Sequence, residues 1–343
     1  MVRTAPSFGT LARRQQARFR RCLSAAAQRP DDDKGLRNPH LIAHGCELEN
    51  LYPSLRGVGG ALDFFRDRRI KWWTSARSGD RPIGPGYEGP TRNLASSQVA
   101  CVNFLLPLAA APDGLAAFLR AIDEDVLGVV AITDREARTS PVEFEWVGWS
   151  EPLEGGAITR GANQTSVDAL VIGRTTAGNR AYLFEWKYSE EYLRPENKGL
   201  GPKGQTRRLR YQDLFRRPDS PFNNAAPFDE FLFEPFYQIM RLRLLADRML
   251  REGVGPDLPI SDARVVVMCP EANDEYREVV QTTPLSRRFP TLTMVEDVVR
   301  ATLKERGSFS VVAPEVVLET LRASQLSLSL AAWTEYHRER YGW

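Results

Sequence analysis

Two short runs of apolar residues, at positions 167–172 and 181–186, form the clearest hydrophobic pattern in the chain. The stretch between them contains Gly173, Gly178 and Asn179, which are typical of the turn of a hairpin. We therefore expect two antiparallel strands joined by a turn at 173–179. The runs are rich in Val, Ile, Leu, Phe and Tyr, which favours interior strands over an exposed ribbon.

Further apolar patterns on both sides of this hairpin predict alternating helices and strands. The expected core elements are an apolar helix, a strand, the hairpin, a long amphipathic helix and a buried strand, at 94–108, 141–149, 167–186, 228–250 and 263–269. Their order is α-β-β-β-α-β. Additional helices are expected nearer the ends of the chain, at 11–28, 62–73, 293–305, 313–324 and 329–341. We divide the chain accordingly into an N-terminal extension with a basic and a Trp-rich helix (1–92), an α/β core (93–273) and a C-terminal helical part packed on that core (274–343).

Three charged residues interrupt the apolar hairpin. Asp168 lies near the start of the first strand, and Glu185 and Lys187 lie near the end of the second. Because side chains alternate between the faces of a strand, Glu185 and Lys187 point the same way and Trp186 points the other way. Antiparallel pairing brings the start of one strand beside the end of the next. We therefore expect Asp168 next to Glu185, with Lys187 one step along.

Charges on the face of a buried sheet are costly unless they are paired or used for chemistry. Mg²⁺ binds one or two carboxylates together with waters and phosphate oxygens. A lysine beside such an ion can orient the attacking water and neutralise the charge that develops on a phosphate. The pattern therefore predicts metal-dependent hydrolysis of phosphodiester bonds. The alternative is a surface hairpin in which Glu185 and Lys187 form a solvated pair that contributes little to stability.

These residues resemble the motif of the PD-(D/E)XK superfamily, the restriction-endonuclease-like nucleases. Asp168 corresponds to the first acid and Glu185-Trp186-Lys187 to E-x-K, while Val167 stands where the family usually has proline. The resemblance implies a restriction-endonuclease-like fold, with a mixed central sheet flanked by helices and helical additions at both ends. It also implies Mg²⁺ as cofactor, with Mn²⁺ as a substitute, and DNA as substrate. Gln238 corresponds to a glutamine that many members place near the metal-bound water or a phosphate.

Longer segments are similar to one bacterial branch of these nucleases, which is described as restriction-endonuclease-like. The segments are N-L-A-S-S-Q-V-A-C-V-N-F-L-L-P-L (93–108), E-F-E-W-V-G-W (143–149), R-G-A-N-Q-T-S-V-D-A (160–169) and E-P-F-Y-Q-I-M-R-L (234–242). The implied roles are metal binding by Asp168 and Glu185, catalysis by these two with Lys187 and Gln238, and cleavage within DNA. Such nucleases often form homodimers to cut both strands. Two alternatives stay open: a nuclease acting on DNA ends or branches, and a catalytically idle nucleic-acid-binding module.

The superfamily often adds an acid from the first helix of the core, but this sequence offers Gln98 and Asn103 there. Glu143 and Glu145, on one face of the expected strand at 141–149, are the substitutes. We choose Glu145 as the third neighbour of the metal. The alternative is that both glutamates face solvent.

Basic residues cluster in two segments. The segment 199–217 follows the second strand of the hairpin and predicts a flexible loop and a short helix, in which Lys203, Arg207, Arg208 and Arg210 would hold the DNA backbone. The segment 11–28 predicts a basic helix that either contacts phosphates or forms a solvated surface. The aromatic residues at 62–73 could stack on bases, but burial in the core is favoured.

The composition is that of an ordinary globular protein, with 42% hydrophobic and 26% charged residues among 343. Because 46 basic residues nearly balance 44 acidic ones, any DNA contact needs local positive patches. Four scattered cysteines without a C-x-x-C pair argue against a zinc ribbon or a disulfide framework. No apolar run reaches the roughly 20 residues that span a bilayer, and no signal peptide is visible. We therefore expect a cytoplasmic protein without a membrane partner.

Overall fold

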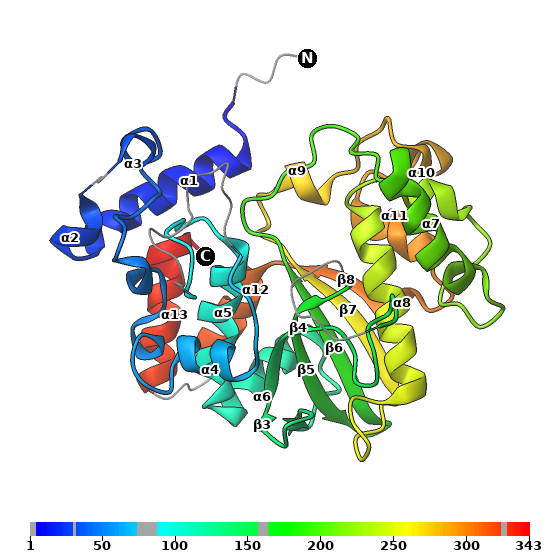
Figure 1. Ribbon diagram of the computed structural model, residues 1–343, viewed down its shortest axis with the longest axis horizontal. Coiled ribbons are helices and arrows are strands. Elements are labelled where there is room, and N and C mark those ends of the chain that lie inside the picture. Colours follow the sequence, from blue (N-terminus) through cyan, green and yellow to red (C-terminus); the bar gives the residue numbers. More distant parts are fainter. Residues whose placement is uncertain (1–4, 30–31, 74–87, 157–163, 324–327) are drawn as a thin grey trace.

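The computed structural model describes residues 5–29, 32–73, 88–156, 164–323 and 328–343 (Figure 1). Within these residues, a six-stranded sheet has the order β1-β5-β6-β7-β8, and β4 also pairs with β5. The strands are β1 (Gly128–Val130), β4 (Val142–Trp146), β5 (Val167–Thr175), β6 (Gly178–Trp186), β7 (Asp262–Met268) and β8 (Phe309–Val312). The pairs β1·β5, β4·β5 and β5·β6 are antiparallel, whereas β6·β7 and β7·β8 are parallel. The sheet is therefore mixed, and β2 (Ile132–Thr133) and β3 (Thr139–Ser140) form a small ribbon beside it.

Helices cover both faces of the sheet (Figure 1). Ala169 and Val171 of β5 pack into one hydrophobic cluster, and Leu170 and Ile172 pack into the other, so the continuous apolar run reflects burial on both faces. The first cluster contains side chains of α5 (Ser97–Ala109), α6 (Pro112–Ile122), α12 (Pro314–Ala323) and α13 (Leu328–Tyr341). The second contains side chains of α7 (Gly201–Arg216), α8 (Phe236–Glu252), α9 (Asp274–Arg277), α10 (Pro284–Arg288) and α11 (Val295–Ala301).

The hairpin strands are longer than the sequence predicts. Only Thr176 and Ala177 form the turn, and Gly173 and Asn179 lie inside the strands. Gly173 is needed in β5 for close packing, because a Cβ atom there would lie 2.9 Å from the ring of Tyr182. The expectation of a turn over 173–179 was wrong because this glycine serves packing and not chain reversal.

Two other boundaries differ from the prediction near the hairpin. The segment expected as a loop and a short helix is the 16-residue helix α7, which begins at Gly201 with Pro202 in its first turn, where proline is favourable. Its Tyr211 and Phe215 are buried one turn apart, and this packing stabilises a helix that local sequence alone does not suggest. Helix α8 begins later than expected, after a short 3-10 helix (Phe228–Phe231) and Pro235.

The N-terminal part is also divided differently. The basic segment forms α1 (Phe8–Phe19), a 3-10 turn (Arg20–Cys22) and α2 (Ala25–Gln28), followed by α3 (Asp33–Arg37). Helix α4 (Ala61–Asp67) buries Phe65 as expected. Trp73 was also expected in the core, but it is 51% exposed. Helix α1 packs against α13, where the side chain of Gln16 donates a hydrogen bond of 2.9 Å to the carbonyl oxygen of Arg340.

The C-terminal part contains the three expected helices, but it also supplies β8, which the sequence pattern did not reveal. Trp333 and Tyr341 are buried, and the indole nitrogen of Trp333 donates a hydrogen bond of 3.2 Å to the carbonyl oxygen of Asn103 on α5. The terminal aromatic residues thus dock on the core. None of the helices in the described ranges is both long enough and apolar enough to cross a membrane.

Candidate active site

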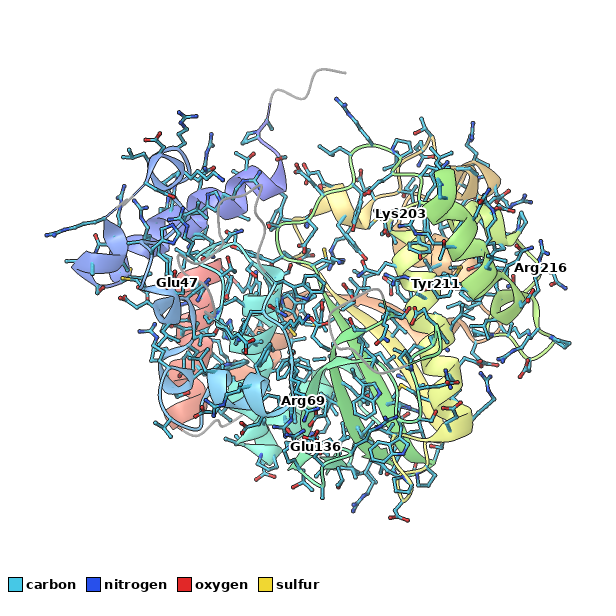
Figure 2. The ribbon with its side chains drawn as sticks, viewed as in Figure 1. Glu47, Arg69, Glu136, Lys203, Tyr211 and Arg216 are labelled. Carbon is cyan, nitrogen blue, oxygen red and sulfur yellow. The ribbon has the colours of Figure 1, made fainter. Side chains whose placement is uncertain are left out.

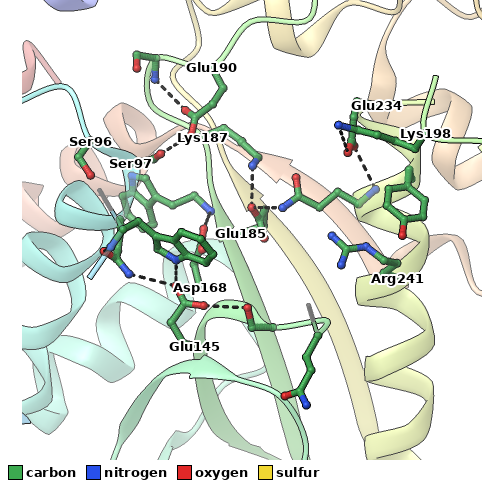
Figure 3. Close-up of a pocket in the computed structure, with 18 of the residues that line it drawn as sticks. Ser96, Ser97, Glu145, Asp168, Glu185, Lys187, Glu190, Lys198, Glu234 and Arg241 are labelled. Atoms are coloured by element: carbon green, nitrogen blue, oxygen red, sulfur yellow. Dashed lines mark hydrogen bonds and ion pairs between the residues drawn. The ribbon is translucent and has the colours of Figure 1, made fainter. Parts of the chain in front are cut away.

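Asp168, Glu185 and Lys187 line one cleft of about 900 Å³ at the ends of β5 and β6. The antiparallel register pairs Ala169 with Phe184. Asp168 precedes Ala169 and Glu185 follows Phe184, so these two residues lie opposite each other. Figure 3 shows these side chains between Glu145 on one side and Arg241 of α8 on the other. The structure therefore gathers the three residues that the hairpin pattern singles out.

Glu185 is the centre of a buried polar group. Its Oε1 atom lies 2.7 Å from Nζ of Lys187 and accepts a hydrogen bond of 2.7 Å from Nε2 of Gln238. Glu185 is 3% exposed and Lys187 is 6% exposed, so water screens this ion pair little. Burial opposes the charge of Lys187, but the contact with the carboxylate of Glu185 outweighs it and raises the pKa of Lys187 above its ordinary value. Lys187 is therefore an ammonium ion at neutral pH.

Asp168 lies at the bottom of the same cleft. Its Oδ2 atom accepts a hydrogen bond of 2.7 Å from the backbone amide of Trp186, which fixes the direction of the carboxylate. Burial, and then the negative charges of Glu185 and Glu145, raise the pKa of Asp168 well above its ordinary value. A cation bound among these carboxylates would reduce the repulsion between their negative charges.

Glu145 reaches this cleft through an unusual backbone conformation. Its φ angle is +48°, in the left-handed region that non-glycine residues rarely adopt, and the ladder between β4 and β5 skips it. Phe144 and Trp146 consequently pack on opposite faces of the sheet, although regular alternation would put them on one face. Burial raises the pKa of Glu145. An interruption of this kind re-aims a side chain, as β-bulges do next to active sites.

Glu143 does not join Glu145. It is fully buried and pairs with Arg68, whose Nε lies 2.9 Å from its Oε1 atom, and it does not line the cleft. The expectation that both glutamates share one strand face was therefore wrong, because the backbone at Glu145 breaks the alternation. The alternative of a solvent-facing pair was also wrong, since Glu145 is 2% exposed.

Three donors hold Glu145, and none of them was predicted in this role from the sequence. Its carboxylate accepts hydrogen bonds from Nε1 of Trp73 at 2.8 Å, from Oγ of Ser166 at 2.8 Å and from Nε2 of Gln98 at 3.2 Å. Gln98 was noted only as a departure from the family pattern, and Trp73 was assigned to the core. Asn103, the other polar residue of α5, lies away from the cleft and accepts a hydrogen bond of 2.7 Å from the amide of Tyr52.

The wall opposite the carboxylates is basic and aromatic. Helices α7 and α8 place Lys203, Arg207, Arg210, Tyr237 and Arg241 along the cleft, and Lys203 and Arg216 mark opposite ends of α7 (Figure 2). The guanidinium groups of Arg207 and Arg241 lie 5.4 Å and 4.9 Å from the centre of the Tyr237 ring. Such stacking orders the arginines while it leaves their charge in the cleft.

Arg208 differs from its neighbours on α7. Its Nε donates a hydrogen bond of 2.8 Å to Asp229, its Nη1 donates one of 2.8 Å to the carbonyl oxygen of Gly199, and it does not line the cleft. Arg208 was predicted to hold DNA together with Lys203, Arg207 and Arg210, in a basic segment expected as a flexible loop and a short helix. A helix instead turns this position away, since Arg207 and Arg208 are about 100° apart around its axis. The cleft is also lined by Lys198, Glu234 and Arg241, which were not predicted because they belong to no recognisable sequence motif.

The carboxylates of Asp168 and Glu185 have the chemistry that a Mg²⁺ ion requires. Among the described residues, none donates a hydrogen bond to Oδ1 of Asp168 or to Oε2 of Glu185, so each has one oxygen available to an ion. In the same part of the chain, no three His, Cys, Asp or Glu side chains come together as a metal-binding group. A site here would therefore consist of two carboxylates completed by water and phosphate oxygens, which is usual for Mg²⁺.

Comparison with known proteins adds the family. The sequence model of a family described as "Restriction Endonuclease associating with ARP" matches residues 76–342. The chain belongs to this restriction endonuclease family. No curated protein and no solved structure matches it.

Membership of the restriction endonuclease family agrees with the architecture. The mixed sheet flanked by helices is consistent with a restriction-endonuclease-like fold, so the expected family and fold class are confirmed. The family indicates a nuclease role. The division at residues 92 and 273 stays a prediction, and the family match covers the expected core, most of the C-terminal part and the end of the N-terminal extension.

Proposed function

We propose that the protein is a Mg²⁺-dependent DNA endonuclease of the PD-(D/E)XK type that acts in restriction. The observation that carries this proposal is the pair of cleft carboxylates, partly buried Asp168 and buried Glu185, each with one available oxygen, beside the ammonium group of Lys187. Mg²⁺, or Mn²⁺ in its place, would supply an activated water and stabilise the leaving oxygen of the scissile phosphodiester. Glu145 is the third acidic neighbour of this centre.

The residues around the centre divide the remaining tasks. Lys187, charged at neutral pH, stabilises the negative charge that grows on the phosphate and orients the attacking water. Gln238 is a positioning residue, because it holds the carboxylate of Glu185 through Oε1 and leaves Oε2 available to an ion. Lys203, Arg207 and Arg210 line the opposite wall, where they bind the DNA backbone without reading its sequence. A homodimer, with one cleft for each strand, is the assembly we propose for double-strand cleavage.

The test is cleavage of supercoiled plasmid in Mg²⁺, in Mn²⁺ and in EDTA, on methylated and unmethylated DNA. Wild type should nick the plasmid in either metal but not in EDTA, and Asp168→Ala and Lys187→Ala should lose the activity. Asp257→Ala and Lys304→Ala are matched controls, because both residues are exposed and lie outside the cleft. Activity that survives in Asp168→Ala would contradict the proposed centre.

Two further outcomes would redirect the proposal. Degradation of end-labelled linear DNA, with closed circles left intact, would indicate a nuclease that works from ends. DNA binding without cleavage on every substrate and in either metal would indicate a binding module with an idle centre.

A further inference from the structure

A second groove, of about 660 Å³, lies on the N-terminal part of the chain. Its lining residues come from α1, the turn that follows it, α2, and the end of α3 with the residues after it. Figure 1 locates these elements at the N-terminal end of the chain. Six arginines line it: Arg13, Arg14, Arg18, Arg20, Arg21 and Arg37. Its lining within the described residues includes no carboxylate. We call this feature the arginine groove.

Most of these arginines have no partner that would explain their clustering. Arg20 is held by the fold, since its Nη1 donates a hydrogen bond of 2.9 Å to the carbonyl oxygen of Leu41. Arg14, Arg18 and Arg21 are exposed, and no described carboxylate forms an ion pair with them. Exposed arginines elsewhere either form ion pairs, as Arg338 does with Glu335, or are scattered, as Arg287 and Arg322 are, so the clustering distinguishes the groove. Like charges gathered without counter-charges repel one another, so the groove favours an anionic occupant.

The spacing of the exposed arginines suits a repeating anion. Arg14, Arg18 and Arg21 are at positions i, i+4 and i+7, which places them along one face of the helix and the turn that continues it. Neighbours at this spacing have Cβ atoms about 5–6 Å apart. Guanidinium groups bind phosphate oxygens in a bidentate manner, and a row of them follows a chain of phosphates.

The arginine groove adjoins the active cleft. A Cβ atom on Gly9 would lie 2.9 Å from the carbonyl oxygen of Ser189, which lines the cleft, while the neighbouring Thr10 lines the groove. Helix α1 is fixed in this place, since the side chain of Gln16 donates a hydrogen bond of 2.8 Å to Tyr188, the residue after Lys187. The linings of the groove and of the cleft therefore approach each other where Gly9 and Thr10 lie against Ser189, beside Glu190 of the cleft.

We propose that the arginine groove binds the phosphate backbone of the same DNA molecule whose scissile bond occupies the cleft. This inference rests on the proposed nuclease function and extends the footprint of the DNA beyond the catalytic centre. Continuity with the cleft favours DNA over an acidic protein segment, which would need no such alignment. The groove supplies affinity and orientation and does not touch the reacting atoms.

The test compares wild type with the triple variant Arg14→Gln/Arg18→Gln/Arg21→Gln. Glutamine keeps the helix propensity of arginine, so the variant should fold, and circular dichroism checks this. Binding of a fluorescent duplex of roughly 30 base pairs is measured in EDTA over a range of salt concentrations. Loss of three phosphate contacts should lower affinity at least about tenfold near 0.1 M salt and reduce the slope of log K against log[salt] by about 2–3.

Two matched variants show whether position and charge are responsible. Arg287→Gln/Arg306→Gln/Arg322→Gln removes the same charge from exposed positions outside both grooves and should bind as wild type does. Lysine at positions 14, 18 and 21 should restore most of the affinity, since it keeps the charge.

The outcomes separate this inference from the nuclease proposal. An unchanged affinity and salt slope in the glutamine triple variant would overturn the role of the arginine groove, while metal-dependent cleavage by the same variant would leave the nuclease proposal standing. Binding of polyglutamate provides a further check. If polyglutamate binds wild type as tightly as the duplex does, and its affinity falls as much in the triple variant, the groove would be a site for an acidic protein partner and the DNA proposal would be overturned. An equal loss of binding in the control triple variant would show that the effect comes from net charge alone, and this would also overturn the role of the arginine groove.

Discussion

Nε2 of Gln238 donates a hydrogen bond of 2.7 Å to Oε1 of Glu185, across 53 positions of the chain. The bond joins α8 to the end of β6, and Lys187 contacts the same oxygen. Gln238 thereby fixes the rotation of the carboxylate. With Lys187 and Gln238 both on Oε1, Oε2 is the oxygen that Glu185 would offer to an ion in the proposed centre.

Replacing Gln238 with alanine should therefore impair catalysis without impairing DNA binding. We expect kcat to fall about 10–100-fold and the Mg²⁺ concentration for half-maximal activity to rise, because partners of metal ligands typically have effects of this size. Cleavage rates over a Mg²⁺ titration, with DNA affinity measured in EDTA, provide the check. Gln281→Ala, at an exposed position, is the control. If Gln238→Ala has the Mg²⁺ dependence of wild type, Gln238 does not position the metal ligand.

Mg²⁺ should stabilise the folded protein through Asp168. A ligand that binds only the folded state raises its stability, so the melting temperature of wild type should be higher in Mg²⁺ than in EDTA. Asp168→Asn should abolish that difference. In EDTA the same variant should be more stable than wild type by roughly 0.5–2 kcal/mol, because it removes one of the like charges around Glu185. Thermal melts of both proteins in EDTA and Mg²⁺ test this, and an equal Mg²⁺ effect in both would exclude Asp168 as a ligand.

The local part of the site could be predicted from sequence. The proximity of Asp168, Glu185 and Lys187 follows from the two-residue period of strands and from the register of a hairpin, which depend on neighbouring residues. The apolar runs that indicated buried strands are equally local. These features needed no knowledge of how distant segments pack.

The surroundings of Glu145 could not be predicted in this way. Trp73 reaches Glu145 across 72 positions, and the positive φ of Glu145 leaves no sign in a sequence. Strand β8 is short and pairs in parallel with β7, 44 positions earlier, so only tertiary contacts stabilise it. Helix α7 was expected as a flexible loop and a short helix because glycines and a proline open the segment, yet most of these residues join the helix, and Tyr211 and Phe215 anchor it to the core.

The two glutamates of β4 should respond differently to substitution. Glu145→Ala should lower the cleavage rate at least about tenfold, because Glu145 lines the cleft beside Asp168 and its negative charge raises the pKa of Asp168. Glu143→Ala should keep the specific activity but destabilise the fold by about 3–5 kcal/mol, since it leaves the buried Arg68 unpaired.

Urea denaturation and plasmid cleavage of both variants separate these effects. The double variant Glu143→Leu/Arg68→Met should recover much of the lost stability, because it removes both charges of the pair. Full activity in Glu145→Ala would leave the centre with two acids only.

Neighbouring arginines on α7 offer a comparison within one helix. Arg210→Gln should weaken DNA binding and reduce the slope of log K against log[salt] by about 1, because Arg210 lines the cleft. Arg208→Gln should change either quantity little, since Asp229 already pairs with Arg208 outside the cleft. Fluorescence anisotropy with a labelled duplex at several salt concentrations measures both. Equal losses in the two variants would mean that α7 contacts DNA with another face.

His337 on α13 should make the docking of the C-terminal helix sensitive to pH. The ring is fully buried, its Nε2 lies 3.3 Å from the carbonyl oxygen of Asn103, and it stacks on Tyr341 and Trp343 with centroids 5.4 Å and 5.7 Å away. Burial lowers the pKa of His337 to about 3. In the unfolded chain the pKa is about 6.5, so below that pH the unfolded state takes up a proton that the folded state does not.

The free energy of unfolding should therefore fall as the pH drops from about 6.5 toward 3, by on the order of 2 kcal/mol between pH 6.5 and 5 from this group. His337→Phe keeps an aromatic ring in the stack but cannot take up a proton. The difference between the two proteins in urea denaturation should shift in favour of the variant as the pH falls from 7.5 to 5, and other titrating groups cancel in that difference. Parallel stability curves over this range would show that His337 is protonated in the folded state or accessible to water, and the docking of α13 on Asn103 would then differ from the one described.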